Sequence, residues 1–110
     1  MTVIFKGIST VKTLKIQRLV IYFETIKMEE DETFNIFHSR LKDIVNSLYD
    51  LGEIILESRV VKKILRSLPD MFLPKITTIE ESKDLNSLTE NELIGPLQTF
   101  EFNQLSKNKT

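Results

Sequence analysis

The stretch TFNIFHSRLKDIVNSLYDLGEIILESRVVKKILRSLP at residues 33–69 decides the fold class, because its apolar residues recur at helical spacing. Thr33 is a suitable N-cap for a first helix, and Gly52 can supply the left-handed residue that ends it. A second helix begins near Glu57 and ends at Pro69, since the residue before a proline is pushed out of helical geometry. The stretch therefore predicts two amphipathic helices joined at a glycine.

The first of these helices, over residues 34–51, has one apolar stripe about 100° wide, as a helix that faces a core does. The stripe consists of Phe34, Phe37, Leu41, Ile44, Val45, Leu48 and Leu51. Ile36 is the exception, because it projects from the polar side of the helix. A single exposed isoleucine usually has no role, but in a self-assembling protein Ile36 is a candidate self-association contact.

The second helix, over residues 57–67, has an apolar side and a basic side. The apolar side is formed by Val60, Val61, Ile64, Leu65 and Leu68, and the basic side by Arg59, Lys62, Lys63 and Arg66. Four cations on one helix face can follow a phosphate backbone, so these four residues are the candidate nucleic-acid contacts. The alternative is a solvated face partly neutralised by neighbouring carboxylates.

On the N-terminal side, residues 12–27 carry apolar residues at helical spacing and predict a further helix. Residues 1–11 show no sustained helical period and are interrupted by Gly7, so they are predicted to form a flexible leader. The acidic run at residues 29–32 predicts a solvated turn beside the next helix, with an acidic contact site for a partner as the alternative.

On the C-terminal side, a short helix is predicted near Pro74, because proline is tolerated in the first turn of a helix. Thr89 and Glu92 then match the S/T-x-x-E capping box that opens a last helix. Pro96 inside that helix predicts a kink or an early stop. Residues 103–110 are polar and are predicted to form a disordered tail.

These patterns together predict an all-α protein, a small bundle of about five helices within one helical domain at residues 12–102. Short connections favour antiparallel neighbours packed around a shared core. The predicted core consists of Phe23, Phe34, Phe37, Leu41, Val45, Ile64, Leu65 and Leu68.

Composition narrows the function more than it defines it. With 110 residues, the chain forms one domain at most. Its net charge of -1 creates no strong overall electrostatic field that would attract nucleic acid. Because it contains no cysteine, it has no disulfide or thiolate chemistry. His38 is the only histidine and fits a half-buried structural residue, so no metal site is expected. No residues with a catalytic or cofactor-binding pattern are recognised, and neither a small-molecule substrate nor a membrane partner is expected. A cytoplasmic location is predicted, with a nuclear one as the alternative.

The order of four segments resembles the gag polypeptide of copia-type LTR retrotransposons. The segments are FETIKMEEDET at 23–33, SRLKDIVNSLYDLGE at 39–53, VVKKILRSLP at 60–69 and TTIEESKDLNSLTENELIGPLQTFE at 77–101. GISTVKTLKIQRL at 7–19 is similar to the segment that leads into this block. The resemblance implies a helical, capsid-like protein without enzymatic activity that associates weakly with itself and forms the particle that packages retroelement RNA.

The chain also departs from the family's pattern. The family usually continues into a zinc knuckle of three cysteines and one histidine, which supplies RNA binding, and it usually has a helical region before this block. The chain is therefore expected to be truncated at both ends, and RNA binding to depend on the absent zinc-knuckle region. Three interpretations stay open: a self-associating structural module, a nucleic-acid-binding helical domain, and an inert retroelement relic.

Overall fold

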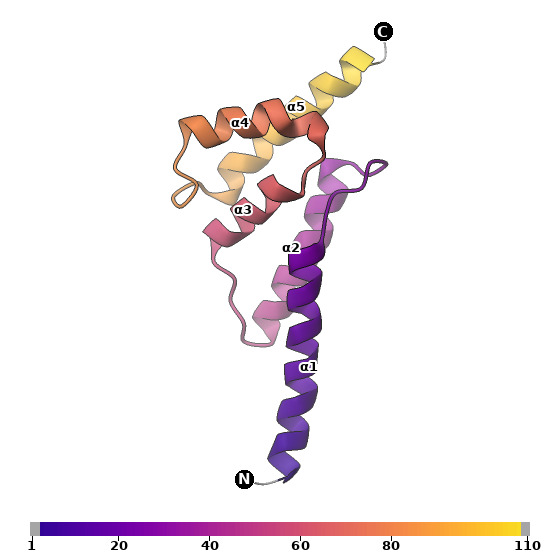
Figure 1. The fold of residues 1–110 in the computed structure, drawn as a ribbon, viewed down its shortest axis with the longest axis vertical. Helices are drawn as coiled ribbons and strands as arrows, with labels where there is room; N and C mark the ends of the chain where they lie inside the picture. Colours follow the sequence, from indigo (N-terminus) through magenta and orange to yellow (C-terminus); the bar gives the residue numbers. More distant parts are fainter. Residues whose placement is uncertain (1–2, 109–110) are drawn as a thin grey trace.

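The computed structural model of the protein describes residues 3–108 and the side chains of residues 10–107, and all regular elements in this range are helices (Figure 1). The elements are α1 (Val3–Thr25), α2 (Phe34–Asp50), α3 (Glu57–Ser67), the 3-10 helix η1 (Asp70–Phe72), α4 (Leu73–Ser82) and α5 (Glu90–Asn108). The predicted all-α bundle of about five helices is confirmed. The molecule extends over 65 × 30 × 18 Å, and α1 begins at the end opposite to where α5 finishes.

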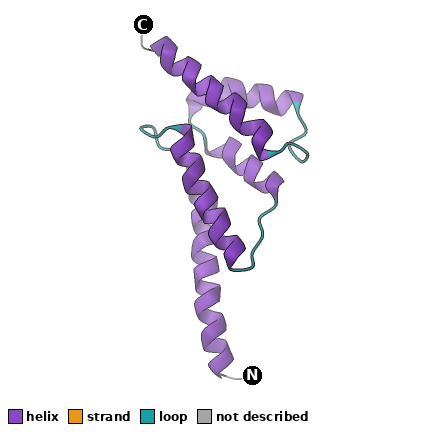
Figure 2. Ribbon diagram, turned by 180° about the vertical axis from the view of Figure 1, so that it is seen from behind, coloured by secondary structure: helices purple, strands orange, loops and turns teal. Residues whose placement is uncertain are grey.

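The helices α1 and α2 form an antiparallel pair in which the C-terminal half of α1 lies along α2 (Figure 2). Thr33 caps α2 as predicted, because its hydroxyl accepts a hydrogen bond from the amide of Ile36 at 3.3 Å. Gly52 follows α2 with φ +91°, the left-handed conformation that favours glycine. The chain then turns toward α3, whose N-cap position is occupied by Leu56 without a side-chain hydrogen bond.

One hydrophobic core joins all five α-helices. Of the eight predicted core residues, six are buried, whereas Val45 and Leu68 are half-buried at the edge of the core. Phe34 is fully buried in this core, with ring centroids 6.3 Å from Phe37 and 6.5 Å from Phe72. The buried core residues are Phe23, Ile26, Met28, Phe34, Phe37, Leu41, Val60, Val61, Ile64, Leu65, Phe72, Ile76, Ile79, Leu88, Leu93 and Leu97.

The start of the first helix differs from the prediction. α1 begins at Val3 rather than near Lys12, so the predicted leader at residues 1–11 is helical over 3–11, while residues 1–2 lie outside the described range. A helix anchored farther along the chain adds one hydrogen bond for each residue it fixes, and the single Gly7 lowers its stability by only about 1 kcal/mol.

Among residues 3–108, the structure contains no helix long and apolar enough to cross a membrane.

The last helix confirms its predicted start but not its predicted end. Thr89 and Glu92 form the capping box, with the Thr89 amide donating to Glu92 at 2.9 Å and the Glu92 amide donating to Thr89 at 3.2 Å. The helix continues through Pro96 to Asn108, so the prediction of an early stop is wrong. The exposed Pro96 ring faces solvent, while Leu93 and Leu97 are fully buried on the inner side and hold the helix on the core.

The polar tail predicted at residues 103–110 is also helical as far as Asn108, and residues 109–110 lie outside the described range. Gln104 on this last segment is half-buried, whereas Leu105 is 47% exposed. Polarity alone therefore did not end the helix, since a helix can continue along polar residues of adequate helix propensity.

Candidate functional site

The four basic residues predicted as nucleic-acid contacts lie together in the structure, on the outer side of α3. Arg59, Lys62, Lys63 and Arg66 line a shallow depression of about 330 Å³ between α3 and the end of α1. Phe23 and Glu24 of α1 form the remainder of its lining. We call this surface the basic depression.

The end of α1 holds two of these cations in place. The guanidinium of Arg59 lies 5.4 Å from the ring centroid of Phe23 and 3.5 Å from the carboxylate of Glu24. The ammonium group of Lys63 donates to the backbone carbonyl of Glu24 at 2.7 Å. Glu24 therefore neutralises part of the surface, as the solvated-face interpretation requires for a neighbouring carboxylate.

The other two cations are less restrained. Lys62 donates to the side-chain carbonyl of Asn86 at 2.8 Å, a neutral partner that leaves its charge uncompensated. Arg66 is exposed, and within residues 3–108 no carboxylate lies at ion-pair distance from its guanidinium. The basic depression thus retains more positive than negative charge, a balance that suits an anionic ligand.

The pKa of Lys63 reflects its burial first and the crowding of positive charge second. Burial lowers the pKa of Lys63 from its ordinary value, and the charges of Lys27 and Arg66 lower it further, while Glu24 opposes them. Lys27 was absent from the predicted site because it lies beyond the end of α1. The spacing of residues along α3 cannot reveal that Lys27, from another segment of the chain, lies close to the site.

The residue predicted as a self-association contact lies on a different surface. Ile36 is 52% exposed in the first turn of α2, and the lining of the basic depression includes no residue of α2. Its neighbour Asn35 accepts a hydrogen bond from Gln98 of α5 at 2.6 Å. Ile36 therefore lies beside the surface where α2 meets α5.

The histidine occupies a structural position, as its edge location in the apolar stripe predicted. His38 is stacked on Phe34 with ring centroids 5.8 Å apart, and its Nε2 lies 2.7 Å from the carboxylate of Glu90. Lys42 donates to the other oxygen of Glu90 at 3.0 Å. Burial alone would raise the pKa of Glu90, but the hydrogen bonds from His38 and Lys42 lower it below its ordinary value.

This polar cluster joins α2 to the first turn of α5. The Glu90 amide donates to the carboxylate of Glu57 at 2.8 Å, which adds the start of α3 to the same junction. Across the described part of the chain, no three histidine or carboxylate side chains converge to hold a metal ion. The sequence analysis missed the partners of His38, because Glu90 lies 52 residues away.

Comparison with known proteins gives one match. A family model described as the gag-polypeptide of LTR copia-type matches residues 2–110. Neither the curated proteins nor the solved structures contain a match to the chain.

Proposed function

The chain belongs to the gag-polypeptide family of copia-type LTR retrotransposons, and we propose that it acts as a structural module that associates with further copies of itself. The family match over residues 2–110 is the observation that carries this proposal. Because gag polypeptides are generally structural proteins, the proposed role requires no catalytic residues. We also propose that the protein is located in the cytoplasm, with the nucleus as the alternative.

Exposed apolar side chains support the proposal independently of the family. Besides Ile36, large apolar residues with about half or more of their surface exposed lie on α1, α2, α4 and α5 and in the loop before α3. Exposed large apolar side chains are the groups that a second copy of the chain can bury on association. The exposed residues are Val11, Leu14, Ile21, Tyr22, Ile36, Tyr49, Ile54, Leu56, Leu73, Phe102 and Leu105.

The proposal is tested by measuring molar mass with size-exclusion chromatography and light scattering over a wide protein concentration range. Oligomers that grow with concentration support self-association, whereas a monomer at every concentration and salt level overturns it. Ile36→Asp tests the predicted contact without harming α2, because a carboxylate is favourable in the first turn of a helix. Asn91→Asp, which also places a carboxylate on an exposed residue in the first turn of a helix but outside this set, is the control.

A second candidate function is supported by the basic depression. Its uncompensated cations, Lys62 and Arg66, together with Lys27 near Lys63, form a surface that suits the phosphate backbone of single-stranded RNA. Binding of this kind is electrostatic, so it weakens steeply as salt increases. The exposed ring positions usually found in single-stranded RNA sites are lacking here, because Phe23 is buried.

Fluorescence anisotropy with a labelled single-stranded RNA tests this candidate. The double variant Lys62→Glu/Arg66→Glu is expected to weaken binding and to reduce its salt slope, since each lost phosphate contact removes about one from that slope. The control variant Lys75→Glu/Lys83→Glu reverses two charges that do not line the depression, on α4 and directly after it. Equal affinities of the two variants and the wild type would exclude the basic depression as the RNA site.

A further inference from the structure

The helix α1 is apolar on two sides, although only one of them packs on the body of the protein. Its inner side, which includes the half-buried Leu19 and the buried Phe23, faces α2 and the core. On the other side, Val11, Leu14 and Ile21 each remain more than half exposed. A surface helix normally has one apolar stripe, so a second stripe indicates a further contact surface.

The charges on this helix restrict what can cover its outer stripe. Between residues 10 and 25 the cations are Lys12, Lys15 and Arg18, and the single carboxylate is Glu24, which is paired with Arg59. Arg18 lies within the outer stripe itself, seven residues after Val11 and three before Ile21. A second α1 would bring like charges together, whereas an acidic surface with apolar side chains would complement this one.

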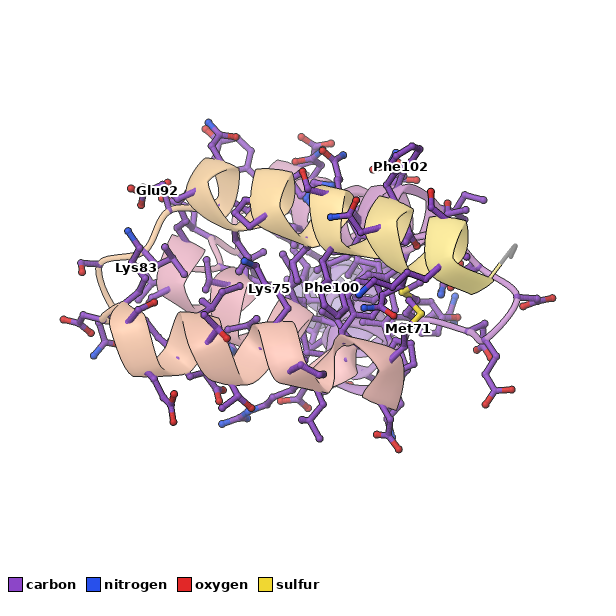
Figure 3. All side chains as sticks on the ribbon, turned by 90° about the horizontal axis from the view of Figure 1, so that it is seen from above. Met71, Lys75, Lys83, Glu92, Phe100 and Phe102 are labelled. Carbon is purple, nitrogen blue, oxygen red and sulfur yellow. The ribbon has the colours of Figure 1, made fainter. Side chains whose placement is uncertain are left out.

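Such a surface exists at the end of the same molecule where α5 finishes. Phe102 and Leu105 are 69% and 47% exposed on the last turns of α5. Figure 3 shows Phe102 on the outer side of α5, pointing away from the body, whereas Phe100 points inward toward Met71. The hydrogen bond between Asn35 and Gln98 places the exposed Ile36 next to this part of α5.

An acidic turn lies at the same end. Glu29, Glu30 and Asp31 are exposed in the turn before α2, while the carboxylate of Glu32 is occupied by Arg40. The turn lies beside α5 because the amide of Phe34, just after it, donates to Glu101 at 2.8 Å. Figures 1 and 2 both show this turn in the half of the molecule where α5 finishes, with the last turns of α5 extending beyond it.

We infer that copies of this chain associate head to tail, with the outer stripe of α1 in one copy seated on the apolar and acidic end of the next. That end is formed by Ile36, Phe102 and Leu105 together with Glu29, Glu30 and Asp31. The inference rests on the proposed self-association and names the two surfaces that carry it. Both the apolar side chains and the charges of the two surfaces are complementary.

The geometry explains why this contact joins different copies. The outer stripe faces away from the body on α1, and α1 runs away from α5 toward the N-terminus (Figure 1), so one copy cannot bring its own α1 onto its own α5. A contact between two different surfaces is heterologous and repeats from copy to copy, which yields a closed ring or an open filament rather than a symmetric dimer. Because part of the attraction is electrostatic, association weakens as salt increases.

A charge-swap experiment tests the inference by light scattering. The variant Lys12→Glu/Lys15→Glu/Arg18→Glu makes α1 acidic, and the variant Glu29→Lys/Glu30→Lys/Asp31→Lys makes the turn basic. Each variant alone is expected to associate at least about tenfold more weakly than the wild type, because like charges then meet. A mixture of the two restores association, since every contact between different variants again joins opposite charges. Glu80→Lys/Glu81→Lys on the exposed surface of α4 is the matched control and is expected to associate like the wild type.

Cysteine cross-linking gives an independent readout, since the natural chain contains no cysteine. A mixture of Leu14→Cys and Phe102→Cys chains is expected to form disulfide-linked heterodimers under mild oxidation, and neither chain alone is expected to cross-link efficiently. Efficient cross-linking of Leu14→Cys with itself would instead show a symmetric α1 pair and overturn the inference. An assembling wild type whose charge variants assemble equally well would overturn it too, while leaving the proposed function intact. A wild type that is monomeric throughout would overturn both.

Discussion

The backbone amide of Phe34 donates a hydrogen bond to the carboxylate of Glu101 at 2.8 Å, across 67 residues of sequence. Phe34 is the first residue of α2, where helix amides lack partners within the helix and the helix dipole favours a negative charge. Glu101 lies on α5, so a side chain of the last helix completes the N-terminus of the second. The contact fixes the acidic turn, the start of α2 and the second half of α5 in one arrangement.

Replacing Glu101 by alanine is expected to lower the free energy of unfolding by about 1–2 kcal/mol, because an amide at a helix N-terminus loses a charged acceptor. Glu101→Gln retains an oxygen acceptor without the charge and is expected to lose less. Urea denaturation followed by circular dichroism measures both effects. Asn103→Ala, on the exposed side of the same helix, is the control, and a loss as large as that of Glu101→Ala would contradict the assignment.

The Glu90 cluster is expected to make stability dependent on pH in the acidic range. Hydrogen bonds from His38 and Lys42 outweigh burial and lower the pKa of Glu90 in the folded state, so the unfolded state binds more protons as pH falls. This stabilisation is therefore present above the unfolded pKa of about 4.3 and is lost as pH falls through the lower folded value. Glu90→Gln should be less stable near neutral pH and lose less stability on acidification.

Denaturation midpoints measured between about pH 7 and pH 3 test this expectation, because the wild-type and variant curves should converge at the acidic end. Glu32 and Glu92 also have lowered pKa values, so the variant keeps part of the pH dependence. Parallel curves for the wild type and Glu90→Gln would show that the cluster does not stabilise the fold through its charge.

The N-cap of α3 is a position where stability can be gained. Leu56 provides no hydrogen bond to the first turn and is 69% exposed, so its side chain contributes little to the core. Leu56→Ser is expected to stabilise the protein by about 1 kcal/mol, which corresponds to a rise in Tm of about 4–8 °C for a domain of this size. Ile54→Ser removes an exposed apolar residue of the same loop without adding a cap, and it should give no comparable gain in calorimetry.

Two glycines are expected to respond in opposite directions to alanine. Gly52 has φ +91°, so a Cβ there is strained by about 1–2 kcal/mol although no atom lies within 4 Å of its position. Gly95 lies inside α5 with the same open surroundings, and alanine there should stabilise the protein by about 0.5–1 kcal/mol. Chemical denaturation of both variants separates the backbone effect from packing, and a gain at Gly52 would contradict the left-handed assignment.

Much of the helical architecture could be predicted from local spacing. The apolar stripe of α2, its Thr33 cap, the Thr89–Glu92 capping box and the two faces of α3 all involve residues within a few positions of one another. The helices α1 and α5 were predicted too short, because α1 begins earlier and α5 ends later than their sequence patterns indicated. Both errors came from treating a glycine, a proline or a polar segment as an end, although packing and helix propagation can outweigh one weak position.

The candidate site was predicted in part for the same reason. Arg59, Lys62, Lys63 and Arg66 share a helix face, so their spacing alone places them together. Glu24 and Phe23, which restrain Arg59, come from a helix more than thirty residues earlier in the chain. The charge balance of the depression depends on that contact, and no local pattern contains it.

The sequence by itself determined the helical class of the protein and its family, because helix signals are local and the family's segments occur in a recognisable order. The tertiary structure decided which charges meet and which apolar residues remain exposed. The sequence showed Glu90 only as a residue in the first turn of a helix, whereas the structure places its carboxylate beside His38 and Lys42. In the same way, only the structure shows that one apolar side of α1 packs against α2 while the other remains exposed. Burial and ion pairing depend on distances between segments far apart in the chain, and those distances exist only after the core has formed.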